Sequence, residues 1–156
     1  MDEWRKIVTV YLDETTVPRR SPELEHDRAV AIYDLIEDNH FVPVGDFRGP
    51  FVLHIGIEEN RLRFGIHDEA DQPLTSFTMP LSPFRSVIRD YFTVCESYYD
   101  AIKTASSSRI EAIDVGRRGL HDEGAEILLA RLAKHVKIDF VSARRLFTLI
   151  CVLHMR

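Results

Sequence analysis

The chain has 156 residues, of which 45% are hydrophobic and 29% are charged, with a formal net charge of −5 and two cysteines. This length favours a single domain spanning residues 1–156, and the average composition excludes collagen-like, repeat, disulfide-scaffold and largely disordered chains. The negative charge argues against a domain that wraps a nucleic-acid backbone. The charge is uneven, however. Residues 1–108 hold 11 basic and 19 acidic residues, whereas residues 109–156 hold 9 and 6, so a local anion site in the last third is compatible with the composition.

The N-terminus and the apolar stretches indicate the compartment. The opening MDEWRKIVTVYLDE is acidic and lacks the basic start and long apolar core of a secretion signal. The longest apolar stretch, residues 146–153, is much shorter than the roughly 18 residues that cross a bilayer. Cys95 and Cys151 lie in apolar helical patterns without CxxC spacing, which is typical of reduced, buried thiols. We therefore expect a cytoplasmic protein with no membrane association.

The first third of the chain predicts a strand and a helix. Residues 5–12 are rich in β-branched and aromatic side chains and predict the strand. Ser21 suits the N-cap of the helix and Pro22 its first position, and Asn39 ends it. The apolar residues that we expect to face inward are Val30, Ile32, Tyr33 and Ile36.

A β-hairpin is predicted in the middle of the chain. Residues 51–57 and 62–66 alternate between apolar and polar, and a turn centred between Glu59 and Asn60 sets the apolar side chains of the two strands opposite one another. The predicted pairs are Ile57 with Leu62, Ile55 with Phe64, and Leu53 with Ile66. Residues 74–79 predict a further strand, which gives an antiparallel meander with the first strand alongside.

The second half of the chain is predominantly helical in pattern. Ser82 and Pro83 suit the start of a helix with an apolar stripe over residues 84–102, and the serines at 106–108 suit the start of another that runs to Lys134. Gly116 and Gly119 leave open whether residues 108–134 form one helix or two. Residues 136–140 predict a short strand.

Asp139 suits the N-cap of a final helix that is apolar nearly all round, which places this helix in the core or at a subunit interface, with the core favoured. Strands followed by helices indicate an α+β fold. We expect an antiparallel sheet of about four strands packed by about four or five helices, with a helical C-terminal half.

Familiar catalytic motifs are absent from the sequence. There is no GxxxxGK[ST], HExxH, GxSxG, GxGxxG or zinc-spaced Cys/His quartet, and neither cysteine has the spacing of a phosphatase loop. His121 and its acidic neighbours Asp122 and Glu123 are consecutive, so on a helix they point in three directions and cannot share one metal ion. His54 and His67 share a sheet face with Arg63, but no third ligand is spaced to join them. We therefore expect no metal and no cofactor, and the sequence favours a protein that is not an enzyme.

The most unusual segment is VGRRGLHDEGAE at residues 115–126. Gly116 and Gly119 bracket Arg117 and Arg118, and His121 follows. If this segment forms a turn before a helix, its backbone N–H groups, two guanidinium groups and imidazole would be placed to bind a phosphate or a carboxylate. Two further arginines, at positions 144 and 145, would join such an anion site if the start of the last helix met the turn.

A structural interpretation of the same glycines competes with the anion site. Gly116 and Gly119, together with Ala112 and Gly124, are spaced to line a close helix crossing that leaves the arginines solvated. Because no strand precedes the segment, we favour packing. The order helix, GxxG, helix, strand also matches a KH module that grips single-stranded RNA, but the acidic residues around the turn argue against nucleic acid.

Three long blocks resemble a known family. They are SPELEHDRAVAIYDL, then LSPFRSVIRDYFTVCESYYDAIKTASSSRIEAIDVGRRGLHDEGAEIL, and finally ARRLFTLICVLHMR. Over residues 21–38 and 81–156 the chain resembles the uncharacterised protein family 0262 of alphaproteobacteria. The resemblance implies a bacterial cytoplasmic protein and carries over no activity, cofactor or catalytic residue.

Three functions follow as hypotheses. Because catalytic motifs are missing while helices with large apolar faces are frequent, we expect a non-enzymatic binding or regulatory module that acts through a protein partner, with a homodimer as one form. The alternative is an enzyme or binder of a small phosphate or other anion that uses Arg117, Arg118 and His121. The third is KH-like binding of single-stranded RNA through the GxxG turn.

Overall fold

The computed structural model describes residues 3–13 and 22–154, so the predicted N-cap Ser21 lies outside the described residues. Its strands are β1 (Ile7–Leu12), β2 (Phe41–Pro43), β3 (Phe51–Glu58), β4 (Arg61–His67), β5 (Pro73–Pro80) and β6 (Val136–Ile138). Its helices are α1 (Pro22–Glu37), a 3₁₀ turn at Ser82–Phe84, α2 (Arg85–Thr104), α3 (Ser107–Leu132) and α4 (Phe140–His154). The α+β class and the helical C-terminal half are confirmed.

The main sheet has the order β1-β3-β4-β5. The predicted hairpin register is confirmed, since Ile57, Ile55 and Leu53 pair with Leu62, Phe64 and Ile66. Glu59 and Asn60 both have a positive φ, as a two-residue turn of this kind requires. The prediction of an all-antiparallel sheet is wrong, because β1 runs parallel to β3. The chain between them contains α1, and such a crossover allows a parallel pairing that local alternation does not reveal.

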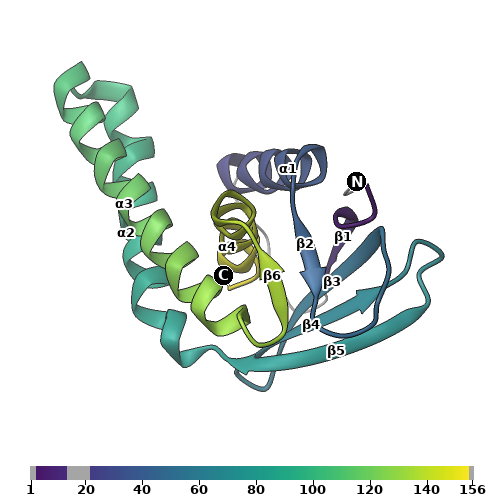
Figure 1. Cartoon of the computed structure of the whole chain (residues 1–156). Coiled ribbons are helices and arrows are strands. Elements are labelled where there is room, and N and C mark those ends of the chain that lie inside the picture. Colours follow the sequence, from purple (N-terminus) through teal and green to yellow (C-terminus); the bar gives the residue numbers. More distant parts are fainter. Residues whose placement is uncertain (1–2, 14–21, 155–156) are drawn as a thin grey trace.

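A second, two-stranded sheet pairs β2 with β6 in antiparallel order. The short strand predicted after residue 135 is confirmed as Val136–Ile138, whereas β2 is too short to show alternation. This pairing joins segments that lie almost a hundred residues apart. It fixes the position of the chain just before α4 begins (Figure 1).

The inward face of helix α1 agrees only in part with the prediction. Ile32 packs against the core as expected, whereas Val30, Tyr33 and Ile36 are exposed. The fully buried residues are Ala31 and Leu35. Ala31 is small, and it is buried because α4 packs closely against α1. The apolar pattern of α1 alone does not indicate this contact. The predicted end at Asn39 is confirmed, since its side chain bonds the carbonyl of Leu35 and both backbone groups of Ile7.

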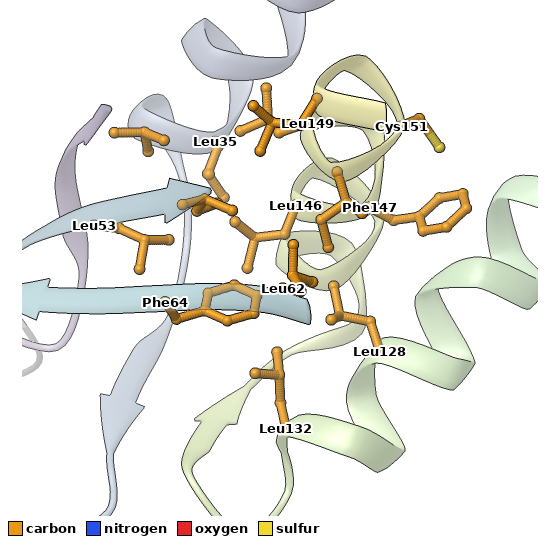
Figure 2. Close-up of a cluster of buried hydrophobic side chains, with 14 of the residues drawn as sticks. Leu35, Leu53, Leu62, Phe64, Leu128, Leu132, Leu146, Phe147, Leu149 and Cys151 are labelled. Atoms are coloured by element: carbon orange, nitrogen blue, oxygen red, sulfur yellow. The ribbon is translucent and has the colours of Figure 1, made fainter. Parts of the chain in front are cut away.

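Helix α4 is the central helix of the core, in agreement with the favoured interpretation. It packs against α1, α3 and β3, and Leu146, Phe147 and Leu149 are fully buried. Figure 2 shows these side chains meeting Leu35 of α1, residues of the sheet such as Leu53, and Leu128 of α3.

Helices α2 and α3 form an antiparallel hairpin that extends beyond the rest of the fold (Figure 1). Ser106 caps α3 as predicted, accepting a hydrogen bond from the amide of Arg109. Ser82 is not an N-cap, because it is the first residue of the 3₁₀ turn, whose N-cap position is Leu81. Over residues 3–13 and 22–154, no helix combines the length and the apolar character that crossing a bilayer requires.

Candidate anion-binding pocket

A pocket of about 360 Å³ lies where α1, α3 and α4 meet, with Tyr91 of α2 in its wall. Each helix contributes residues three or four positions apart, so one face of each helix lines the cavity. The lining residues are Asp27, Val30, Ala31, Asp34, Tyr91, Arg117, Arg118, His121, Val141, Arg144, Arg145 and Thr148.

The GRRG segment is helical, which answers the question that the sequence left open and excludes the turn at residues 116–119 that the anion-clamp hypothesis needs. Helix α3 runs unbroken from Ser107 to Leu132, and its backbone amides are used within the helix. Each glycine lowers the helix propensity by about 1 kcal/mol, but the cap at Ser106 and the buried Leu128 and Leu132 hold the helix on the core. The free amides expected of an anion clamp, and the GxxG turn of a KH module, are therefore not formed.

The glycines of this segment do not line a helix crossing either. A Cβ at Gly116 or Gly119 would meet nothing within 4 Å, and neither residue lines the pocket. Gly124 does pack closely, since a Cβ there would overlap the ring of Phe147 in α4. The close approach of α3 to α4 thus depends on Gly124 alone among these three glycines.

The two arginines of α3 that line the pocket both pair with one carboxylate, that of Asp114. Asp114 accepts a hydrogen bond of 2.6 Å from Arg117 and lies 3.3 Å from Nε of Arg118. The guanidinium of Arg117 also stacks over the ring of Tyr98 at 4.1 Å, which fixes its plane. Arg118 is more open, with 58% of its side chain exposed.

Two arginines of α4 face the same cavity. Nε of Arg144 lies 2.7 Å from a carboxylate oxygen of Asp122 on α3. Arg145 donates a hydrogen bond of 2.8 Å to the carbonyl of Asp38, just past the end of α1. The start of α4 therefore meets the basic segment of α3, as the anion-site hypothesis requires.

His121 joins α3 to α4 beneath these arginines. Its Nε2 lies 2.8 Å from the carbonyl of Arg144 and 2.6 Å from Oγ1 of Thr148, while a guanidinium nitrogen of Arg144 lies 3.4 Å from Nδ1. A carbonyl only accepts and a guanidinium only donates, so the proton is on Nε2 and the Nδ1 lone pair faces Arg144. Burial, aided by the positive charge of Arg144, lowers the pKa of His121 to about 4. The imidazole is neutral at pH 7 and positions Arg144.

Acidic residues surround these arginines. Asp27 and Asp34 of α1 line the pocket, so four arginines face two aspartates there. Asp27 accepts a hydrogen bond of 2.6 Å from the hydroxyl of Tyr99, a phenol whose pKa burial and Asp27 raise. Asp114 and Asp122 pair with three of the four arginines, so carboxylates and guanidinium groups around the pocket are equal in number. An anion entering the pocket meets the guanidinium N–H groups that these carboxylates leave unused, with Arg118 the most accessible of the arginines whose exposure the structure gives.

The structure brings together five of the seven residues singled out from the sequence: Arg117, Arg118, His121, Arg144 and Arg145. The sequence analysis missed the contribution of α1 and α2. The spacing of Asp27 and Asp34, seven residues apart on one face of α1, is the signal that could have indicated it.

Two other sets of nucleophilic or metal-ligating side chains lie outside the pocket. Cys95 and Cys151 are free and buried, and burial raises the pKa of both thiols, which opposes a nucleophilic role. The statement that His54 and His67 lack a third ligand is wrong, because the loop after β4 brings Asp71 to both imidazoles. Asp71 comes from a loop whose conformation the strand pattern does not predict.

Comparison with known proteins decides the family. The model of the Uncharacterised protein family (UPF0262) matches residues 4–156. The chain belongs to this family. Among UPF0262 relatives, one from Rhodopseudomonas palustris (strain TIE-1) is 55% identical, covering 99% of this chain and 95% of its own length.

Other UPF0262 proteins match equally broadly. One from Bradyrhizobium sp. (strain BTAi1) is 53% identical over 99% of this chain and 93% of its own, and one from Paramagnetospirillum magneticum is 52% identical over 100% and 99%. No solved structure matches the chain.

Proposed function

We propose that this protein binds a small anionic ligand, bearing a phosphate or carboxylate group, in the pocket between α1, α3 and α4. The observation that carries the proposal is the convergence of Arg117, Arg118, Arg144 and Arg145 from two helices on one cavity. Guanidinium groups form paired hydrogen bonds with phosphate and carboxylate oxygens, and a partly closed site strengthens them. The volume of about 360 Å³ suits a small metabolite.

The existing ion pairs explain how such a site stays folded without a ligand. Asp114 and Asp122 hold Arg117, Arg118 and Arg144 in place while leaving other guanidinium N–H groups for a ligand. His121 fixes the backbone and the side chain of Arg144 from below. A pre-positioned set of donors lowers the entropy cost of binding.

The described residues favour a binding or regulatory role over catalysis. His121 is neutral and committed to hydrogen bonds between α3 and α4, so a free general base is not evident beside the arginines. The free, buried state of Cys95 and Cys151 suits a reducing compartment, so we place this binding in the cytoplasm.

A thermal-shift screen tests the proposal. The probes are inorganic phosphate, pyrophosphate, nucleoside phosphates, sugar phosphates and dicarboxylates. At a ligand concentration a hundredfold above Kd, binding adds about 2.7 kcal/mol to the free energy of unfolding, so we expect the Tm to rise by several degrees with at least one probe. The double variant Arg118→Ala/Arg144→Ala should lose this rise.

Arg131→Ala is the matched control, because Arg131 is an exposed arginine of the same helix outside the pocket. It should respond to the probe as the wild type does. No stabilising probe, or an equal rise in the double variant, would contradict the proposal.

A second candidate function rests on the far end of the α2–α3 hairpin, which extends beyond the rest of the fold (Figure 1). Ile102 near that end is 49% exposed, and Val115 on α3 is 56% exposed. We propose a second copy of this chain as the partner for these side chains. Light scattering should then show a dimer in the wild type and a monomer in Ile102→Glu/Val115→Glu, and a wild-type monomer at all concentrations would exclude it.

A further inference from the structure

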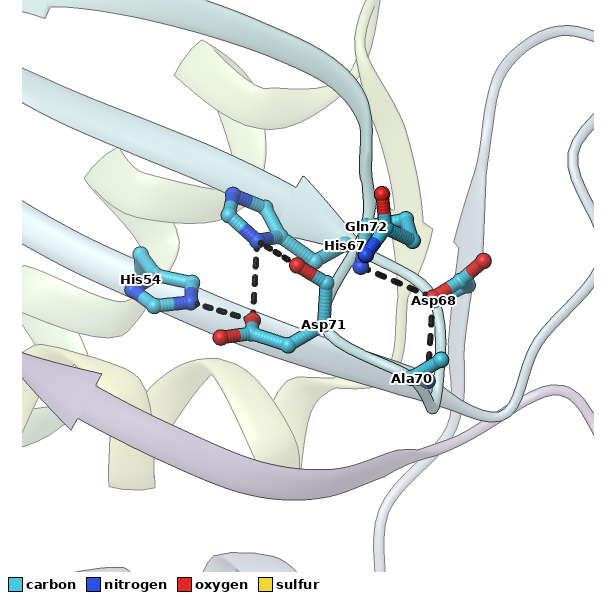
Figure 3. Close-up of polar contacts among 6 residues, drawn as sticks. All are labelled: His54, His67, Asp68, Ala70, Asp71 and Gln72. Carbon is cyan, nitrogen blue, oxygen red and sulfur yellow. Dashed lines mark hydrogen bonds and ion pairs between the residues drawn. The ribbon is translucent and has the colours of Figure 1, made fainter.

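The open face of the main sheet carries a cluster of two histidines and one aspartate, away from the arginine pocket. His54 lies on β3, His67 on β4 and Asp71 in the loop that leads to β5 (Figure 3). Along β3, His54 alternates with the buried Leu53 and Ile55, so its side chain points away from the core.

The three side chains converge on one point. Oδ1 of Asp71 lies 2.8 Å from Nε2 of His54 and 2.9 Å from Nδ1 of His67. Dashed lines mark both contacts in Figure 3. All three ligand atoms lie within 4.8 Å of one another. Around an ion with bond lengths of about 2.0–2.1 Å, neighbouring ligand atoms lie about 2.8–3.4 Å apart. Two of the three separations already have the length that a shared metal ion needs.

The loop holds Asp71 over the imidazoles. Asp68 accepts hydrogen bonds from the amides of Ala70 and Gln72, and the amide of Asp71 bonds the carbonyl of Asp68. These bonds close a tight turn in which Asp71 adopts a φ of +63°. Aspartate tolerates this left-handed conformation better than most residues. The turn thus directs the carboxylate back toward the sheet.

The sheet provides the space in which the two imidazoles meet. Their ring centres lie 4.1 Å apart, and Tyr11 of β1 packs against His54 at 5.0 Å. Gly65 pairs with His54 across the strands, and a Cβ there would lie 3.5 Å from Cβ of His54 and 3.4 Å from Nε2 of His67. A side chain longer than alanine at position 65 would compete with the histidines for this space.

We propose that His54, His67 and Asp71 form a binding site for a divalent first-row transition-metal ion. Two imidazoles and one carboxylate are the donor set of many zinc and iron(II) sites. The side chains are 30%, 20% and 52% exposed, so water or a substrate has access to the remaining coordination positions. The ion takes the place of the two hydrogen bonds to Asp71. An imidazole binds a metal ion through an unprotonated ring nitrogen, so in the metal-bound site the proton of each ring is on its other nitrogen.

The test is titration of the full chain, purified without a polyhistidine tag and freed of metal, with Zn²⁺ by calorimetry. We expect one ion per chain. His54→Ala and Asp71→Asn should each bind Zn²⁺ at least about tenfold more weakly, because even outer-sphere changes cost this much. His26→Ala is the matched control, an exposed histidine on α1, and should bind as the wild type does.

Titration with Co²⁺ gives a second readout. A Co²⁺ ion with four or five ligands in a protein site absorbs visible light more intensely than the hexa-aqua ion in solution. This absorption should appear with the wild type and with His26→Ala, and should weaken in His67→Gln. Circular dichroism checks that each variant is folded. Absence of saturable binding in the wild type, or equal binding in His54→Ala and Asp71→Asn, would overturn the proposal and leave a hydrogen-bonded cluster only.

Discussion

Single side chains, rather than backbone groups, determine the chemistry of the pocket. Arg117 is held by Asp114 and by the ring of Tyr98, and Arg144 is held by Asp122 and His121. In each case a charged group is fixed by a neighbour on another turn or another helix. The arginines therefore present an ordered set of donors, in contrast to four solvated surface cations.

The buried histidine makes stability depend on pH. In the folded protein the pKa of His121 is about 4, below its ordinary value of about 6.5. As the pH falls through this interval the unfolded chain takes up the proton first, so stability present above pH 6.5 is lost toward pH 4. The loss is at most about 3 kcal/mol.

Denaturant titrations at several pH values check this prediction with His121→Gln, which cannot titrate. The variant should lose less free energy of unfolding than the wild type between pH 6.5 and 4. Parallel curves for the two proteins would show that His121 does not carry the dependence.

At the scale of elements, the glycines of α3 differ in the space around them, so adding a side chain should change stability in opposite directions. Gly124 faces the ring of Phe147, whereas Gly116 and Gly119 face open space. Gly124→Ala should therefore destabilise the protein by about 1–3 kcal/mol through overpacking. Gly116→Ala and Gly119→Ala should each stabilise it by about 0.5–1 kcal/mol, because alanine suits an exposed helix better.

Urea denaturation of the three single variants measures these effects. The account requires the sign to differ between position 124 and the other two. Destabilisation by Gly116→Ala of the size seen at position 124 would contradict an unbroken helix with an open face at that position.

Elements with a local origin were predictable from the sequence, and those that depend on distant partners were not. The hairpin register follows from alternation on either side of one short turn, and the start of α3 follows from Ser106. The parallel pairing of β1 and the β2–β6 pair depend on segments far apart in the chain. The same distinction holds for sites: the basic residues of α3 were recognisable, but Asp71 joins the histidines only through a loop conformation.

At the scale of the whole molecule, α4 links the core to the pocket. Its buried face meets α1, α3 and the sheet (Figure 2), and its first two turns carry Arg144 and Arg145 into the cavity. The position of the arginines thus depends on the packing of the helix that carries them.

This central position predicts unequal costs for truncating apolar side chains. Leu146→Ala, at a fully buried site, should lower the free energy of unfolding by about 2–5 kcal/mol. Val44→Ala, at a 56% exposed site, should change it by less than about 0.5 kcal/mol. Equal costs in chemical denaturation would contradict the place of α4 in the core.

Side-chain NMR of the arginines tests anion binding in the pocket most directly. The protein is labelled with ¹⁵N-arginine and titrated with the anion that gives the largest thermal shift. The Nε–Hε signals of Arg117, Arg118 and Arg144 should move together with one Kd, while the signal of Arg131 stays in place. Signals that stay in place, or that all move alike as in a general salt effect, would contradict a ligand held between α1, α3 and α4.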